Sequence, residues 1–262
     1  MQIAVIGTGY VGLVSGACFA EFGPEVTCVD LDAEKVARLQ RGEIPIFEPG
    51  LDALVARGVQ GGRLRFTTDL AAAVGGADVV FIAVGTPSRR GDGHADLRYV
   101  EAAAVEIGRA LSGYTVVVTK STVPVGTGRR VAALIREANP GAHFDMASNP
   151  EFLREGSAIE DFMRPDRVVI GAEGERARAA MAEAARMLPH VTWCDSAYEV
   201  AAGAHAAVLL TEWNEFRALD LPRLREAMQP TPVLVDLRNV YRGPEVVGAG
   251  MAYHGIGRPA PG

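Results

Sequence analysis

The sequence predicts an α/β protein built on a doubly wound parallel sheet, and three observations support this fold class. Short β-branched runs alternate with longer alanine-rich stretches over the first two-thirds of the 262 residues. Turns rich in glycine, threonine, serine and proline follow several of these runs. Apolar residues make up 48% of the chain, which is enough to form a core. Strands that alternate with helices form βαβ crossovers, and such crossovers place the strands of one sheet in parallel.

The elements follow from local patterns. QIAVIG at 2–7 is a short apolar run typical of a buried strand, and a helix is expected after it at about 11–22. EVTCVD at 25–30 is the second strand, and AEKVARLQRG at 33–42 is a helix that ends on a glycine. Further strands are expected at 63–69, 77–87, 114–122, 144–150 and 166–175, with helices at about 98–111, 127–138 and 176–188.

A second, smaller set of strand-like runs follows. They lie at 191–195, 206–216, 232–240 and 252–262. These runs indicate a second α/β module, but three or four strands are too few to bury both faces of an independent parallel sheet. We therefore expect a complete first domain followed by a partial second domain. The partial domain would pack on the first, pair with another chain, or be poorly ordered.

Bulk properties exclude several classes of protein. The net charge of −6 argues against a nucleic-acid partner, which would favour a basic face. No apolar run approaches the roughly 20 residues that a membrane span needs, and the first residues lack the basic start of a signal peptide. The three cysteines (Cys18, Cys28 and Cys194) cannot pair completely and do not have metal-site spacing. A reducing, cytoplasmic location is expected, with no metal site.

A nucleotide-binding motif lies at residues 7–12, where GTGYVG matches G-x-G-x-x-G between a strand and a helix. Gly7 permits the tight turn, Gly9 lets the backbone approach a pyrophosphate, and Gly12 lets helix and strand pack closely. The helix N-terminus supplies N–H donors. Asp30 ends the next strand and would accept the ribose hydroxyls, which favours NAD over NADP. We therefore predict a Rossmann domain that binds NAD; the alternative is a glycine-rich turn without a ligand.

Two later strand ends fit the same site. AVGTPS at 83–88 and TKSTVPVGT at 119–127 place small and hydroxyl residues after a parallel strand, where such sheets bind ligands. Cap and turn chemistry alone is the alternative explanation.

The segment NPEFLREG at 149–156 places two carboxylates four residues apart. A helix would put Glu151 and Glu155 on one face, with Arg154 beside them. This face would be either a solvated surface or the polar rim of a substrate pocket.

Five stretches occur in a recognisable order: GTGYVG, VGTPS, KSTVPVGT, SNPEFLREGSAIEDFMRPDRVVIG and LLTEWNEFRALD. Together they resemble the UDP-glucose/GDP-mannose dehydrogenase family, over residues 1–175 for its NAD-binding domain and 181–262 for its UDP-binding domain. Family members oxidise the C6 alcohol of a nucleotide sugar to a carboxylate in two hydride transfers to two NAD molecules. The resemblance implies UDP-glucose, or a related nucleotide sugar such as GDP-mannose, as the substrate; TEWNEF favours UDP-glucose.

The resemblance also implies roles for individual residues. Thr122 would help to hold a catalytic water, Glu151 matches the catalytic glutamate, and Glu155 would lie where nicotinamide and sugar meet. Such carboxylates can act as a base or orient a water. The implied cofactor contacts are Gly7, Thr8, Gly9, Tyr10, Val11, Gly12, Asp30, Lys35, Val84, Gly85, Thr86, Pro87, Ser121, Thr122 and Glu155. The implied substrate contacts are Glu151, Phe152, Leu153, Arg154, Glu155 and Arg238.

Part of the family pattern has no counterpart in this chain. The thiol nucleophile of the family lies in a GGSCFPKD-like motif, and no such string occurs here. The central helix that carries the family's catalytic lysine and asparagine and mediates dimerisation is also missing, and the join lies near Ala180 and Met181. The resemblance therefore implies a complete NAD-binding domain over residues 1–180 and a partial UDP-binding domain over residues 181–262. Lys35 and Lys120 both belong to the nucleotide domain, so neither replaces the catalytic lysine.

These gaps affect the expected activity. None of the three cysteines has a glycine-rich setting or a basic neighbour in the sequence, so we expect all of them to be packed as small apolar residues. Without a thiol nucleophile, full four-electron turnover would be absent or severely reduced. The alternatives are a non-catalytic NAD-binding module and a dehydrogenase of another nucleotide sugar. A homo-oligomer is possible, without the usual dimerisation helix.

Overall fold

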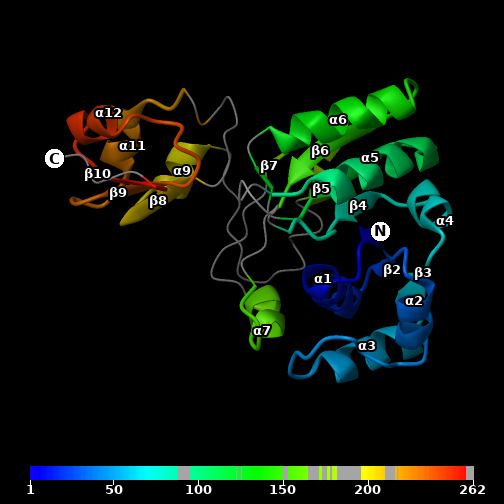
Figure 1. Cartoon of the computed structure of the whole chain (residues 1–262). Coiled ribbons are helices and arrows are strands. Elements are labelled where there is room, and N and C mark those ends of the chain that lie inside the picture. The colour runs from blue at the N-terminus through cyan, green and yellow to red at the C-terminus, as the bar shows by residue number, and fades with distance from the viewer. Residues whose placement is uncertain are drawn as a thin grey trace. The chain divides into compact units, whose positions relative to one another are not determined.

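The computed structural model describes residues 1–87, 95–121, 123–124, 126–149, 153–164, 171–172, 176–177, 179–181, 196–209, 216 and 218–257. The chain divides into two compact units, Met1–Val191 and Thr192–Gly262 (Figure 1).

The first unit is built on a seven-stranded sheet with the order β3-β2-β1-β4-β5-β6-β7. Its strands are β1 (Gln2–Ile6), β2 (Glu25–Val29), β3 (Leu64–Thr67), β4 (Val79–Ile82), β5 (Thr115–Thr119), β6 (Phe144–Ser148) and β7 (Gly171–Ala172). The first six strands run parallel, which confirms the predicted doubly wound sheet. The chain order reverses between β1 and β4, and sheets of this type bind ligands at the carboxyl ends of the strands beside that reversal.

Helices cover both faces of this sheet (Figure 1). They are α1 (Tyr10–Glu21), α2 (Ala33–Gln40), α3 (Leu51–Gln60), α4 (Leu70–Gly75), α5 (Arg98–Ala110), α6 (Thr127–Ala138) and α7 (Ala158–Met163). Alternate residues of β1 point to opposite faces: Ile3 and Val5 pack with α1, α3 and α7, whereas Ala4 and Ile6 pack with α4, α5 and α6. A strand buried on both faces reads as a continuous apolar run, which is why QIAVIG shows no alternation.

The structure differs from the sequence-based expectations at two places in this unit and agrees with them in part at a third. The run predicted as a strand at 166–175 contributes β7, which pairs antiparallel with β6. Helices α3 and α4 were not expected, although Asp69 accepts the N–H of Ala72 and so caps α4. Of the helix predicted at 176–188, residues 176–177 and 179–181 are helical, and the remainder lies outside the described residues.

The second unit contains a three-stranded parallel sheet with the order β10-β9-β8. Its elements are α9 (Ala197–Ala201), β8 (Ala206–Leu209), α11 (Leu221–Ala227), β9 (Val233–Asp236), α12 (Gly243–Gly248) and β10 (Ala252–Gly255). A small core joins them and includes Leu209, Leu221, Leu224, Leu234, Met251 and Tyr253. The described part of this unit is therefore an α/β module, as the alternating pattern predicts. It also has a small core of its own, which the sequence-based expectation of a partial domain did not include. The strand expected at 191–195 lies outside the described residues.

Candidate functional site

The turn between β1 and α1 has the geometry that its glycines predict. Gly7 has a φ of 102°, a left-handed conformation that favours glycine. A Cβ atom on Gly12 would lie 1.9 Å from the carbonyl oxygen of Gly7, so only glycine fits where α1 crosses the turn. Gly9, in contrast, has nothing within 4 Å of the position that a Cβ atom would occupy, so its backbone is open to a ligand. Tyr10 and Val11 follow Gly9 in the first turn of α1.

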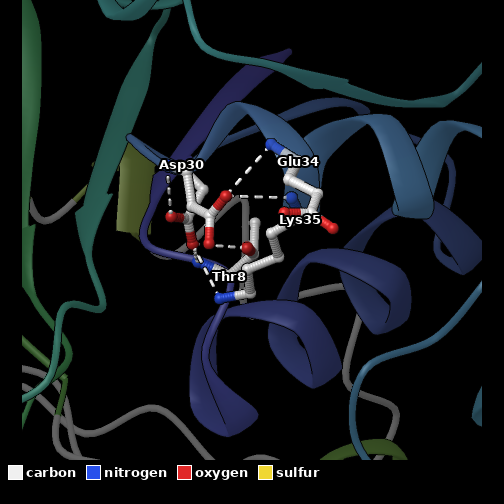
Figure 2. A network of polar contacts seen from close by, with 5 residues as sticks. Thr8, Asp30, Glu34 and Lys35 are labelled. Atoms are coloured by element: carbon white, nitrogen blue, oxygen red, sulfur yellow. Dashed lines mark hydrogen bonds and ion pairs between the residues drawn. The ribbon is translucent and has the colours of Figure 1, made fainter.

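Asp30 is the acceptor at the centre of a polar network at the end of β2 (Figure 2). Its Oδ2 accepts the backbone N–H of Thr8 at 3.0 Å, the Thr8 hydroxyl at 2.5 Å and Lys35 Nζ at 2.8 Å. Its Oδ1 accepts the N–H of Asp32 at 3.1 Å. Asp32 in turn caps α2 by accepting the N–H groups of Glu34 and Lys35, which places Lys35 beside Asp30. The side chains of Asp30 and Lys35 remain 17% and 25% exposed, so both can reach a ligand.

The charge state of Asp30 follows from these contacts. Burial by itself would raise the pKa of this carboxyl, but the hydrogen bonds from Lys35, Thr8 and Asp32 outweigh burial and lower the pKa to about 2. Asp30 is therefore ionised at neutral pH and presents a carboxylate. A carboxylate at this position would accept ribose hydroxyls and would repel a 2′-phosphate.

Acid is expected to weaken the fold through Asp30. A folded-state pKa of about 2 lies below the ordinary value of 3.8, so the stabilisation is complete above pH 4 and is lost as the pH falls towards 2. The full contribution is about 2 kcal/mol. Urea unfolding of the wild type and of Asp30→Asn between pH 6 and pH 3 measures this contribution, as the difference between the two proteins in the free energy of unfolding. We expect this difference to shrink below pH 4; a constant difference would contradict the assignment.

The turns after β4 and β5 lie next to the glycine turn. A Cβ atom on Gly7 would approach the carbonyl oxygen of Ala83 to 2.8 Å, so the β1 turn touches the end of β4. Ser121, after β5, donates its hydroxyl to the carbonyl oxygen of Val84 at 2.7 Å. Val84, Gly85, Thr86 and Pro87 continue from this point, and Gly85 and Pro87 are exposed. The three predicted turns thus meet at one edge of the sheet, while Thr122 lies outside the described residues.

This edge fits a dinucleotide. The first N–H groups of α1 have no partners within the helix, and Gly9, which occupies the N-cap, makes no side-chain cap. Helix N-termini of this kind bind phosphate groups. The open backbone at Gly9 would admit the pyrophosphate, and the carboxylate of Asp30 would accept the ribose hydroxyls.

The part of the NPEFLREG segment that the structure describes is not helical. Leu153 and Arg154 are non-helical, Glu155 lies in an exposed turn, and α7 begins only at Ala158. The described part of this segment, from Leu153 to Ser157, therefore contains no helix, and the alignment of Glu151 with Glu155 stays a hypothesis. Glu151 and Phe152 lie outside the described residues. Arg154 pairs with Asp161, with Nη2 2.6 Å from Oδ1, and its own N–H donates to the same carboxylate.

Two polar contacts were missed by the sequence-based reasoning. Glu48 is 5% exposed and accepts hydrogen bonds from the Tyr10 hydroxyl and from the N–H groups of Gly156 and Ala158. Lys120 is 3% exposed, and its Nζ donates to Asn149 Oδ1 at 3.0 Å. A buried charge needs such partners. The only available signal for Glu48 was its place between the prolines of IPIFEP, which does not identify partners about 110 residues away.

Cys18 and Cys28 are buried, and burial raises the pKa of each thiol to about 12. The expectation of packed, unreactive side chains agrees with this environment. Cys18 has no basic neighbour in the sequence, but folding brings Lys120 close enough for its charge to act to lower the pKa of this thiol. Burial is the larger effect, so Cys18 stays protonated. Cys194 lies outside the described residues.

In the second unit, Arg238 lies in a turn at the carboxyl end of β9. Asp236 is fully buried, and its Oδ1 accepts the N–H of Arg238 at 3.0 Å while its Oδ2 accepts the N–H of Tyr241 at 2.9 Å. Asn239 has a left-handed φ of 52°, a conformation that asparagine tolerates better than most residues. Asp236 therefore shapes the loop that presents Arg238.

The fold, the glycine turn and the Asp30 network together define a dinucleotide-binding α/β protein. Two family models match this chain: the "UDP-glucose/GDP-mannose dehydrogenase family, NAD binding domain" over residues 1–188, and the same family's "UDP binding domain" over residues 175–243. The chain belongs to the UDP-glucose/GDP-mannose dehydrogenase family.

Individual relatives agree with this assignment. The UDP-glucose 6-dehydrogenase of Rhizobium meliloti (strain 1021) is 66% identical over 190 residues, which cover 72% of this chain and 44% of the relative. The solved UDP-glucose dehydrogenase of Pyrobaculum islandicum is 47% identical with a TM-score of 0.69, covering 71% of this chain and 44% of that one. The GDP-mannose dehydrogenase of Pseudomonas aeruginosa is 41% identical with a TM-score of 0.70, covering 73% and 45%. The chain thus spans less than half the length of these relatives.

Within the part of the chain that the structure describes, no helix is both long and apolar enough to cross a bilayer.

Proposed function

We propose that this chain binds NAD and a UDP-glucose-type nucleotide sugar, as a module of a UDP-glucose 6-dehydrogenase. The observation that carries the proposal is the turn at residues 7–12. Only glycine fits at Gly12, the backbone at Gly9 is open, and the ionised Asp30 lies beside Thr8. Close likeness to a UDP-glucose 6-dehydrogenase over 190 residues supports the choice of sugar nucleotide.

The chemistry is the oxidation of an alcohol carbon. Bound NAD would supply the hydride acceptor for C6 of the sugar. The first turn of α1 would hold the pyrophosphate, and Asp30 with Lys35 would hold the ribose. Glu151 and Glu155 would act as a general base for the C6 hydroxyl or orient a water, and Thr122 would help to hold that water. Arg238 would bind the charged part of the nucleotide sugar.

Complete oxidation to the carboxylate needs a second hydride transfer. The aldehyde from the first transfer must become a thiohemiacetal or a hydrate before another hydride can leave. The buried thiols of Cys18 and Cys28 stay protonated, and the chain has no GGSCFPKD-like motif. We therefore expect the four-electron reaction to be absent or severely reduced in this chain alone.

Calorimetric titration of NAD, and then of UDP-glucose in the presence of NAD, tests the proposal directly. Binding of both ligands is the expected result. NAD binding without UDP-glucose binding would favour the alternative of a non-catalytic dinucleotide-binding module. Failure of NAD itself to bind would overturn the proposal as a whole.

A GDP-mannose titration tests the second candidate substrate. Likeness to a solved GDP-mannose dehydrogenase favours including it. Tighter binding of GDP-mannose than of UDP-glucose would replace the substrate in this proposal and keep the reaction type.

A further inference from the structure

The loop between α2 and α3 reverses the usual partition of polar and apolar side chains. In this loop, the aromatic ring of Phe47 is 87% exposed, whereas the adjacent Glu48 is 5% exposed. A glutamate is almost never buried unless its carboxylate is paired, because desolvation disfavours the charged form. The contacts of Glu48 therefore explain why it lies inside.

Glu48 accepts hydrogen bonds from a distant part of the chain. Its Oε2 accepts the N–H of Gly156 at 2.8 Å and its Oε1 accepts the N–H of Ala158 at 2.9 Å. Burial alone would raise the pKa of Glu48, but the hydrogen bonds from Tyr10, Gly156 and Ala158 outweigh it, so the pKa is lowered. The group is therefore an anion that accepts hydrogen bonds from Gly156, within the turn that precedes α7, and from Ala158, the first residue of α7.

Tyr10 connects the same carboxylate to the nucleotide turn. It is the first residue of α1, directly after Gly9, and its hydroxyl donates to Glu48. The hydroxyl also lies 3.5 Å from the carbonyl oxygen of Arg154. Partial burial raises the pKa of Tyr10 to about 12, and the charges of Glu48 and Glu155 contribute to this rise. Glu155 therefore lies near enough to α1 to act on its first side chain.

We propose that Glu48 is a positioning residue that holds residues 153–158 against the first turn of α1, through Gly156, Ala158 and Tyr10. In this way Glu48 sets where Glu155 and Arg154 lie relative to the dinucleotide turn. The consequence for sugar binding rests on the proposed function, whereas the positioning itself does not.

Hydrogen exchange in the ligand-free protein tests the positioning. In Glu48→Gln, an amide replaces one of the accepting oxygens, so at least one of the three donors loses its acceptor. We expect the peptide that contains residues 153–164 to exchange about tenfold faster, since an unpaired buried donor is costly. Peptides from β4 should not change. Glu43→Gln is the matched control, because Glu43 lies in the same loop but is exposed and pairs with Arg38 and Arg41.

Unchanged exchange of residues 153–164 in Glu48→Gln would overturn the proposal. If β4 also exchanged faster, the substitution would have loosened the whole unit, and Tyr10→Phe would then decide. That variant removes one donor and leaves the two backbone bonds to Glu48. Faster exchange confined to residues 153–164 in Tyr10→Phe would support the proposal, and no change there would refute it.

Ligand titrations separate this proposal from the proposed function. Glu48→Gln should weaken UDP-glucose binding about tenfold and NAD binding by a clearly smaller factor, because most of the implied cofactor contacts lie outside the positioned segment. A purely structural role would weaken both ligands together. If the wild type binds no UDP-glucose, the substrate part of the proposed function fails, and the exchange experiment still decides the role of Glu48.

Discussion

Gly12→Ala is expected to destabilise the first unit by about 3 kcal/mol or more, because the new methyl group has no space. Its Cβ would lie 1.9 Å from the carbonyl oxygen of Gly7 and 3.2 Å from the Cβ of Ala83. The first contact is with backbone, so no side-chain rotation can relieve it. Helix α1 would have to move away from β1 and β4. The carboxyl ends of these two strands form the predicted cofactor site, so the site would be distorted as well. Urea unfolding followed by circular dichroism measures the loss.

Gly9→Ala is the matched control for this prediction. Gly9 has a φ of −69° and no atom within 4 Å of the Cβ position, so alanine fits without strain. We expect its stability to stay within about 0.5 kcal/mol of the wild type. NAD binding, in contrast, should weaken at least about tenfold, because the methyl group would occupy the space through which a pyrophosphate approaches the backbone. Equal stability of the two variants would contradict the close packing at Gly12; unchanged NAD binding in Gly9→Ala would contradict the cofactor site.

The second large effect is expected at Asp236, in the second unit. Its fully buried carboxylate accepts the N–H groups of Arg238 and Tyr241 and lies 3.3 Å from the Tyr253 hydroxyl. Asp236→Ala leaves these donors without their acceptor, and each unsatisfied buried donor costs about 1–3 kcal/mol. The core of this unit is small, so we expect the substitution to unfold it and to displace Arg238.

Hydrogen exchange resolved by peptide is the measurement for Asp236→Ala. Peptides from β8, β9 and β10 should lose protection, and those from β1, β4 and β5 should keep it. Glu226→Gln is the control, because Glu226 is an exposed residue of α11 and its charge can change without removing a buried acceptor. Retained protection in β9 would show that Asp236 is not what holds the loop after β9.

The fold of the first unit follows largely from local patterns. The apolar strand runs, the alternating helices and the glycines at 7–12 predict a parallel sheet with a nucleotide turn, and the structure has this sheet. The predicted helix at 127–138 agrees with α6, whose bounds are Thr127–Ala138. Short helices such as α4, and the antiparallel pairing of β7, depend on neighbouring elements and leave a weak local signal.

In the candidate site, too, some residues could be predicted from the sequence, whereas their contacts could be seen only in the structure. Asp30 could be predicted from its spacing to Gly7 along the sequence, because the βαβ unit fixes which strand end follows the glycine turn. The order of segments that identifies the family is likewise carried by the sequence alone. The partners that hold Asp30 ionised, Thr8 and Lys35, became visible only when the turn and α2 were placed together.

The sequence by itself determined the class of fold, the nucleotide motif and the family, because steric demands on glycine and the period of apolar residues act over a few positions. The tertiary structure alone decided that the segment around Glu155 is a turn and that Glu48 and Tyr10 hold it. Those contacts join residues more than 100 positions apart, and a buried carboxylate can be satisfied by any donors that folding brings to it. Hydrogen-bond partners of this kind are set by the packing of whole elements, which no local pattern encodes.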